Sequence, residues 1–107
     1  MIGRLMTMTT QPGRGGELAD VLLKVAERLR GFSGCEIYLI SQDTAAPDTV
    51  HVTEVWRDDA SAQAALAAPP PADGLAPSDV LALLSAPPYR TDVTVLGGVG
   101  VPTDGLP

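Results

Sequence analysis

The stretch VHVTEVWRDD, residues 50–59, combines a β-branched run with one large aromatic residue and a closing pair of aspartates. β-Branched and aromatic residues favour strands, and aspartate commonly caps a following helix. We therefore expect a strand that ends near Trp56 and a helix that begins just after it. Because strand, helix and strand precede this stretch, and two helices and a strand follow it, we place it at the centre of a small sheet.

Hydrophobic periodicity predicts further helices and strands around this central strand. The clearest is a helix that ends at Arg30, with apolar residues at helical spacing and Gly31 as the stop. Asp58 or Asp59 is expected to cap the next helix. Before the central strand we predict a strand at residues 2–10, a turn at 11–16, a helix to residue 30, a strand at 35–42 and a hairpin link at 43–48. After it we predict a helix at 60–68, ended by prolines 69–71, and a loop to residue 76 with a turn at Asp73-Gly74. A helix from Pro77 to the Pro87-Pro88 stop and a strand at 89–96 complete the chain order.

This order, β-α-β-β-α-α-β, fits an α+β fold of the ferredoxin-like sandwich type, a four-stranded antiparallel sheet with helices on one face. The short link at residues 43–48 implies that the strands it joins are antiparallel. Both faces of the first three strands carry apolar residues, so we expect a second copy to cover the face without helices, giving a homodimer. Residues 1–97 form the predicted domain, and the Gly/Pro-rich residues 98–107 form a tail or a dimer arm.

Composition excludes several classes of partner and site. The net charge of −6 opposes binding to nucleic acid or to an anionic membrane, because phosphate neutralisation needs clustered Lys and Arg. No apolar run approaches the roughly 20 residues that span a bilayer, and the N-terminus lacks a secretory signal, so the cytoplasm is the expected compartment. Cys35 is the only cysteine, which excludes an internal disulfide and thiol-rich metal sites and favours simple burial.

The glycine-rich turn at residues 11–16 follows a strand and precedes a helix, as a phosphate cradle would. Neither the dinucleotide fingerprint nor the Lys-Ser/Thr pair of a P-loop is present, and the acids that follow would repel phosphate. We therefore interpret it as a plain turn.

Three short motifs resemble the antibiotic biosynthesis monooxygenase family, with a likeness that covers roughly residues 2–97. They are Gly34-Cys35-Glu36-Ile37-Tyr38 in the second strand, Glu54-Val55-Trp56 at the end of the third, and Asp58-Asp59-Ala60 at the start of the next helix. The resemblance implies a small dimeric α/β barrel. It leaves the reaction open, because similar chains include cofactor-free oxygenases of aromatic polyketides, quinol oxygenases, haem-degrading enzymes and proteins with no known activity.

The pattern of the haem-degrading branch is absent from this chain. That branch has Asn on the first strand, Trp in the helix after the Glu-x-Trp-like strand end, and His shortly beyond. Here the first strand has no Asn, the helix has Ala64-Ala65-Leu66, and prolines 69–71 stand where the His would fall. His51 is the only imidazole and makes no metal site alone. We therefore expect no metal and no cofactor.

Glu54 and His51 are the candidate catalytic residues, and they lie on opposite faces of the central strand because strand side chains alternate. They are therefore not a catalytic dyad. Glu54 among apolar neighbours suits a proton acceptor, with a structural ion pair to Arg4 or Arg90 as the alternative. His51 could act as a proton shuttle or contact the substrate.

Trp56, Tyr38, Tyr89 and Arg4 are the candidate substrate-binding residues. Trp56 offers rigid apolar area for stacking on a flat aromatic substrate, and it would equally fill the core beneath the helices. Tyr38 and Tyr89 could hydrogen-bond a phenol or quinone oxygen, or seal the sheet edge or the dimer contact. Arg4, on a neighbouring strand, is placed to contact a ligand or to pair with Glu54.

Three functions fit these residues. The first is a cofactor-independent monooxygenase of a polycyclic aromatic or quinol-type substrate, in which the protein supplies a base, a dry pocket and hydrogen bonds to an oxyanion. The second is a non-catalytic dimer that binds a small ligand or a partner protein, because the His that many members carry near the end of the second helix is absent. The third is an isomerase or cyclase of polyketide-like intermediates. An open cavity touching Glu54, Trp56 or a Tyr would favour an enzyme, and a closed one the binding protein.

Overall fold

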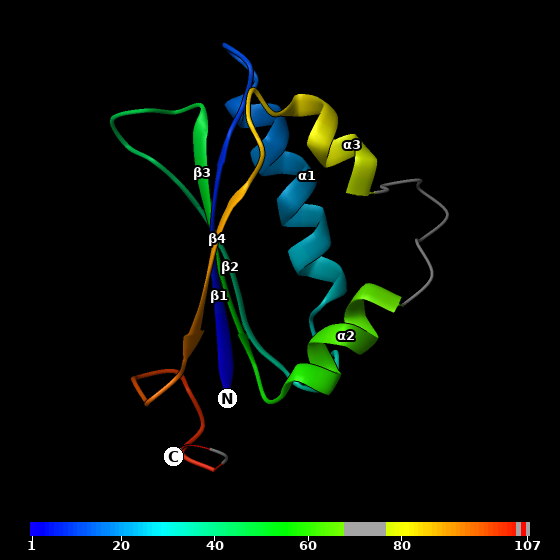
Figure 1. The fold of residues 1–107 in the computed structure, drawn as a ribbon, viewed down its shortest axis with the longest axis vertical. Coiled ribbons are helices and arrows are strands. Elements are labelled where there is room, and N and C mark those ends of the chain that lie inside the picture. The colour runs from blue at the N-terminus through cyan, green and yellow to red at the C-terminus, as the bar shows by residue number, and fades with distance from the viewer. Residues whose placement is uncertain (68–76, 105, 107) are drawn as a thin grey trace.

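A computed structural model describes residues 1–67, 77–104 and 106 of the chain (Figure 1). Within these residues the elements follow the predicted order. They are β1 (Ile2–Thr9), α1 (Gly15–Arg28), β2 (Cys35–Gln42), β3 (Thr49–Trp56), α2 (Asp59–Ala67), α3 (Pro77–Leu83) and β4 (Tyr89–Thr94). The prolines at 69–71 and the predicted turn at Asp73-Gly74 lie outside the described residues.

The strands form one antiparallel sheet in the order β2-β3-β1-β4. β3, which contains most of the stretch quoted first, lies in the interior of the sheet between β2 and β1, as predicted. The hairpin that joins β2 to β3 is closed by the Asp43 carboxylate, which accepts hydrogen bonds from the amides of Ala45 and Ala46 at 2.9 and 2.8 Å. The predicted α+β, ferredoxin-like class is confirmed.

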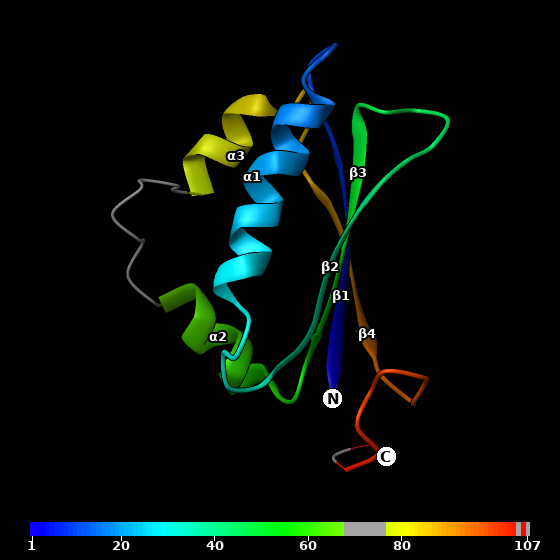
Figure 2. The ribbon, with the colours of Figure 1, turned by 180° about the vertical axis from the view of Figure 1, so that it is seen from behind.

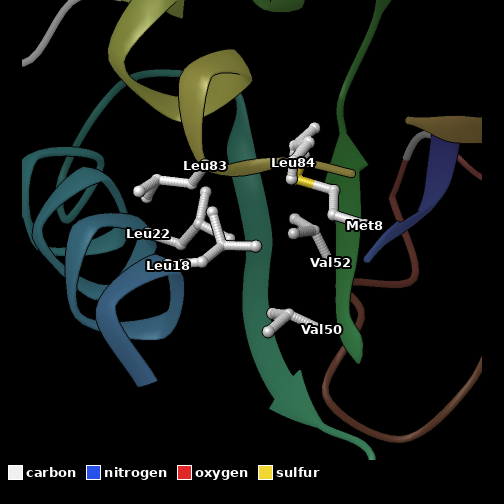
Figure 3. Packing of buried hydrophobic residues seen from close by; sticks show 7 residues of the cluster. All are labelled: Met8, Leu18, Leu22, Val50, Val52, Leu83 and Leu84. Atoms are coloured by element: carbon white, nitrogen blue, oxygen red, sulfur yellow. The ribbon is translucent and has the colours of Figure 1, made fainter. Parts of the chain in front are cut away.

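The described helices all lie on one face of this sheet (Figures 1 and 2). Leu18 and Leu22 of α1 are buried and point toward Val50 and Val52 of β3 (Figure 3). Their i, i+4 spacing places both leucines on the same side of the helix. The resulting core is aliphatic and consists of Met8, Leu18, Leu22, Val50, Val52, Leu83 and Leu84.

The glycine-rich turn before α1 is closed by the protein's own carboxylate. Asp48 accepts hydrogen bonds from the amides of Gly13 and Gly15, both at 3.0 Å, and so satisfies donors that the start of a helix leaves without partners. A Cβ at Gly15 would overlap the carbonyl oxygen of Pro47, which explains why glycine stands there. The place that a bound phosphate would take is therefore occupied by Asp48, in agreement with the predicted plain turn.

β2 departs from the predicted alternation at its start. Cys35 pairs with Trp56 and Ile37 pairs with Val55, so Glu36 is the extra residue of a β-bulge. Strict alternation along the strand predicted at 35–42 would place Cys35 on the same face as Ile37, and this is wrong because the bulge shifts the alternation by one residue. Cys35 instead lines the same surface hollow as Tyr38.

Within the described residues, four elements end earlier than predicted: β1 at Thr9, α3 at Leu83, and α1 and β4 as follows. α1 ends at Arg28 rather than Arg30, because the next residues form i to i−3 hydrogen bonds in place of the i to i−4 bonds of an α-helix. The amide of Arg30, for example, donates to the carbonyl of Glu27 at 3.3 Å. β4 ends at Thr94 rather than Leu96. Thr94 lies opposite Ile2, the first residue of β1, and the amide of Val95 still donates to the carbonyl of Met1 at 3.1 Å. Both predictions follow the apolar pattern of the sequence, which continues past the last residue of α1 and of β4.

The C-terminal segment is tied back to the end of β3. Arg57 donates to Asp104 at 2.7 Å and to one carboxylate oxygen of Glu36 at 3.0 and 3.1 Å. The described part of the C-terminal segment lies at the same end of the molecule as the N-terminus (Figure 1). Whether residues 98–107 act as a tail or as a dimer arm, beside a domain at 1–97, stays a prediction.

Candidate functional site

A row of four polar side chains crosses the helix-facing side of the sheet. Tyr38 of β2 pairs with Glu54 of β3, Glu54 pairs with Arg4 of β1, and Arg4 pairs with Asp92 of β4. Because side chains alternate along a strand, Glu54 points to the same side as Val52, which packs in the core beneath the helices. The register therefore brings three of the predicted site residues, Arg4, Glu54 and Tyr38, into one row.

Glu54 and Trp56 form a buried pair beside this row. The indole Nε1 of Trp56 donates to Glu54 Oε1 at 2.9 Å, and the two residues are 2% and 6% exposed, respectively. The edge of Trp56 also contacts Phe32, with ring centroids 6.3 Å apart. Trp56 thus fills the core, the second of its two predicted roles, and the polar end of its ring supplies the donor that a buried carboxylate needs.

Arg4 is a buried cation that faces an open hollow. It is 7% exposed, and its guanidinium lies 3.8 Å from Asp59 Oδ1, at the first turn of α2. The hollow between β1, β4 and α2 has a volume of about 300 Å³, and a guanidinium fixed at its wall can stabilise negative charge on a bound oxygen. The residues that line it are Ile2, Gly3, Arg4, Asp59, Arg90, Asp92, Val93 and Thr94.

Arg90 and Asp92 form a second charged pair in the hollow. Arg90 Nε donates to Asp92 Oδ1 at 2.7 Å, which raises the pKa of the arginine and lowers that of the aspartate. Both side chains are largely exposed, so the pair contributes little to stability. Arg90 therefore has a close partner at 2.7 Å, whereas the ion pair of Arg4 with Asp59 is longer, at 3.8 Å.

A separate surface hollow of about 350 Å³ lies between the end of α1 and the start of β2. Cys35 and Tyr38 both line it. Burial, with a smaller contribution from the charge of Glu54, raises the pKa of the Cys35 thiol and of the Tyr38 hydroxyl. Both groups are therefore neutral at physiological pH. Cys35, which is predicted to be buried, is only partly buried and lines this hollow.

His51 and Tyr89 lie on the opposite face of the sheet, away from the hollow at Arg4. Thr7 pairs with both residues, and its hydroxyl lies 3.1 Å from Nδ1 of His51. The other ring nitrogen of His51 is 3.7 Å from Asp43. The structure thus separates His51 from Glu54, as alternation predicts, and separates Tyr89 from Arg4.

Sequence reasoning missed two residues of the hollow. The sequence points to Asp59 only as a possible helix cap and as part of the family motif at residues 58–60. The cap is Asp58, whose Oδ1 accepts a hydrogen bond from the amide of Ser61 at 2.7 Å. Asp92 was not singled out at all. A signal for it existed, because Arg90 and Asp92 are two apart in a predicted strand and so share a face.

No cluster of three or more His, Cys, Asp or Glu side chains suited to a metal ion occurs in the described part of the chain. Within the same residues, no helix is both long and apolar enough to cross a membrane. The expectations of no metal, no cofactor and a cytoplasmic location stay predictions.

Together, the sheet, the helix layer and the hollow between them define a small α+β domain of the ferredoxin-like class. Residues 1–72 match the antibiotic biosynthesis monooxygenase family. This match spans more than half of the sequence, so the chain belongs to that family, as its motifs predicted. No curated protein shows significant sequence similarity to it.

Solved structures share the fold of this chain. A protein from Chloroflexus aurantiacus J-10-fl, provisionally named an antibiotic biosynthesis monooxygenase, is 28% identical with a TM-score of 0.74, and the match covers 94% of this chain and 98% of that one. A Deinococcus radiodurans protein with the same provisional name is 22% identical, with a TM-score of 0.76 and coverage of 92% and 96%. A Nitrosomonas europaea protein of unknown function is 25% identical, with a TM-score of 0.70 and coverage of 91% and 90%.

Proposed function

We propose that this protein is a cofactor-independent monooxygenase that acts on a quinol-type or polycyclic aromatic substrate. The observation that carries the proposal is the buried guanidinium of Arg4, which faces an open hollow between the sheet and α2. Membership of the antibiotic biosynthesis monooxygenase family supports the reaction class. The substrate class and the catalytic roles are our own proposals.

The reaction needs only O₂ and an electron-rich substrate. An anthrone-type CH₂ group and O₂ give a carbonyl and water, and a hydroquinone and O₂ give a hydroxyquinone and water. In both cases the substrate first loses a proton, and the resulting anion transfers electrons to O₂. Stabilising that anion is therefore the main task of the protein.

Arg4 is the residue placed to do this. Its guanidinium lines the hollow and offers several N–H donors to one substrate oxygen. Glu54 lies opposite Arg4 on β3, and a hydrogen bond from Trp56 holds the Glu54 carboxylate in place. A hollow of about 300 Å³ is at the lower end of small-molecule sites, so it suits one or two rings of a substrate whose remainder extends into solvent.

The alternative is a non-catalytic protein that binds a small ligand. It is favoured by the lining of the hollow, which includes Arg4 and Arg90 but not Glu54, Trp56 or a tyrosine. In this case the hollow would hold a polar aromatic ligand without turnover.

In either case we propose a homodimer formed through the sheet face without helices. That face exposes large apolar side chains, among them Leu39 at 54% and Tyr89 at 71%. Large apolar side chains exposed on one sheet face support an interaction surface there. His51 would then lie between the two copies, where it could serve the interface rather than the hollow at Arg4.

Oxygen uptake tests the proposed reaction. We expect uptake with anthrone or 1,4-dihydroxynaphthalene to exceed the rate without protein, and Arg4→Met to lose about 100-fold of the catalysed rate, as the loss of one oxyanion donor does elsewhere. Arg14→Met is the matched control, because Arg14 lies at the start of α1 and pairs with Glu17. Uptake equal to the protein-free rate across such substrates would remove the monooxygenase and leave the binding protein. Substrate conversion without uptake would indicate an isomerase or cyclase.

A further inference from the structure

Arg4 and Asp59 form an unusually loose ion pair. Their closest atoms are 3.8 Å apart, whereas Arg57 and Arg90 each hold a carboxylate at 2.7 Å. The side chain of Arg4 is buried and that of Asp59 is 72% exposed, on the first residue of α2 at the mouth of the hollow. A buried charge normally has a close, well-aligned partner. The contact therefore leaves room for an oxygen atom of a ligand to hydrogen-bond with both groups.

We propose that the hydroxyl of a neutral phenolic ligand binds between these two residues, with Arg4 holding its oxygen and Asp59 accepting its proton. The proposal rests on the proposed function for the identity of the substrate as a phenol or hydroquinone. In this step the O–H bond breaks, the proton moves to the Asp59 carboxylate, and the electron pair stays on the oxygen beside Arg4. No electron leaves the ligand, so the step needs no oxidant.

The charges around the hollow explain why the ligand should arrive neutral. The charged residues that line the hollow balance, because Arg4 and Arg90 are matched by Asp59 and Asp92. Glu54 lies opposite Arg4 in the same row but is not part of this lining. An anion would therefore gain no net attraction on entry and would lose its hydration. A neutral phenol avoids this penalty, and the transfer of its proton to Asp59 keeps the total charge of the site constant.

The two residues should affect the ionisation of a bound phenol in opposite directions. Removing the cation at Arg4 disfavours the phenolate, whereas removing the negative charge at Asp59 favours it, because two anions side by side repel each other. Asp59→Asn should nevertheless slow turnover, since no group then accepts the proton. A merely structural role for either residue would not produce this pattern.

A 4-nitrophenol titration tests the proposal without O₂ consumption, because the phenolate of this probe absorbs visible light. With the probe bound to the full-length protein, we expect its ionisation midpoint to lie below that of the free probe. Arg4→Met should give at least about tenfold less phenolate at a fixed pH below the midpoint, and Asp59→Asn should give more. Asp20→Asn, on the exposed side of α1, is the charge-matched control and should change nothing.

Several outcomes would overturn the proposal. They are no binding of the probe at millimolar concentration, equal ionisation in wild type and Arg4→Met, or an effect of Asp59→Asn no larger than that of Asp20→Asn. If Arg4→Met does not fold, the Asp59→Asn comparison still decides, because Asp59 is exposed. Arg4→Met and Asp59→Asn could shift the ionisation of the bound probe in opposite directions in a protein that consumes no oxygen. That result would support this inference and remove the monooxygenase proposal.

Discussion

Two carboxylates near Arg4 have very different surroundings, and this difference separates their functions. Glu54 is buried and accepts a hydrogen bond from Trp56, while Asp59 is exposed at the mouth of the hollow. A carboxylate with a fixed internal donor is suited to structure, and one at a solvent-facing site can exchange protons freely. Glu54 as the base stays a prediction from the sequence, whereas our proposal gives that role to Asp59, the more exposed of the two.

The Trp56–Glu54 hydrogen bond gives a prediction for stability. Trp56→Phe keeps an aromatic ring but removes the donor, so a buried carboxylate loses its partner and we expect a loss of about 2 kcal/mol in the free energy of unfolding. Urea denaturation measures it. Because the two residues are in contact, Glu54→Gln and Trp56→Phe together should deviate from additivity by about 1 kcal/mol.

The two substitutions and their combination form a double-mutant cycle. Its control replaces Trp56→Phe with Leu18→Val, which alters the aliphatic core that contains neither Glu54 nor Trp56. Its cost should add to that of Glu54→Gln within about 0.5 kcal/mol. Additive effects in the Trp56→Phe cycle would mean that the bond at 2.9 Å contributes nothing specific to folding.

At the scale of elements, the start of α2 depends on the charge of Asp58. Hydrogen bonds from the hydroxyl and then the amide of Ser61 hold the pKa of Asp58 below its ordinary value of 3.8. A carboxyl group whose pKa is lowered by folding stabilises the folded state above its ordinary pKa, and this contribution is lost as the pH falls through the lowered value. The cap should therefore weaken only in acid.

Thermal unfolding of Asp58→Ala tests this behaviour. We expect its melting temperature to lie below that of wild type by a constant amount above about pH 4, and the gap to narrow as the pH falls further. Asp20→Ala, exposed within α1, should show no such gap. A gap that does not change between pH 5 and pH 2 would contradict a role for the ionised cap.

How far the sequence predicts these elements depends on whether the signal is local. β3 and the helices were predictable because β-branched runs, caps and helical spacing are properties of neighbouring residues. The bulge at Glu36 was not, because it appears only when β2 is paired with β3. The same holds for the site: Arg4, Glu54 and Tyr38 were identified singly, but their alignment in one row depends on strand register, and Asp59 joins Arg4 only through the position of α2.

At the scale of the whole molecule, the sheet separates two kinds of surface. The helix-covered side contains the core and the hollow at Arg4, and the other side carries His51 and Tyr89 among exposed apolar residues. The proposed activity at the hollow and the proposed assembly through the other face therefore use different residues. Substitutions that affect one process should leave the other largely intact.

Leu5→Glu tests the proposed homodimer. Leu5 lies on the interior strand β1, on the face without helices, and is partly exposed, so a glutamate there is tolerated by a monomer. In a symmetric dimer each copy would bring one uncompensated charge into the apolar contact, and we expect the dissociation constant to rise at least roughly 100-fold. Leu66→Glu, on the exposed surface of α2, is the control and should leave assembly unchanged. Sedimentation velocity over a range of concentrations distinguishes the effects of the two substitutions. Apolar interfaces of standard size are formed at tens of micromolar (about 10⁻⁵ M), so a wild-type protein that sediments as a monomer at that concentration would contradict the dimer.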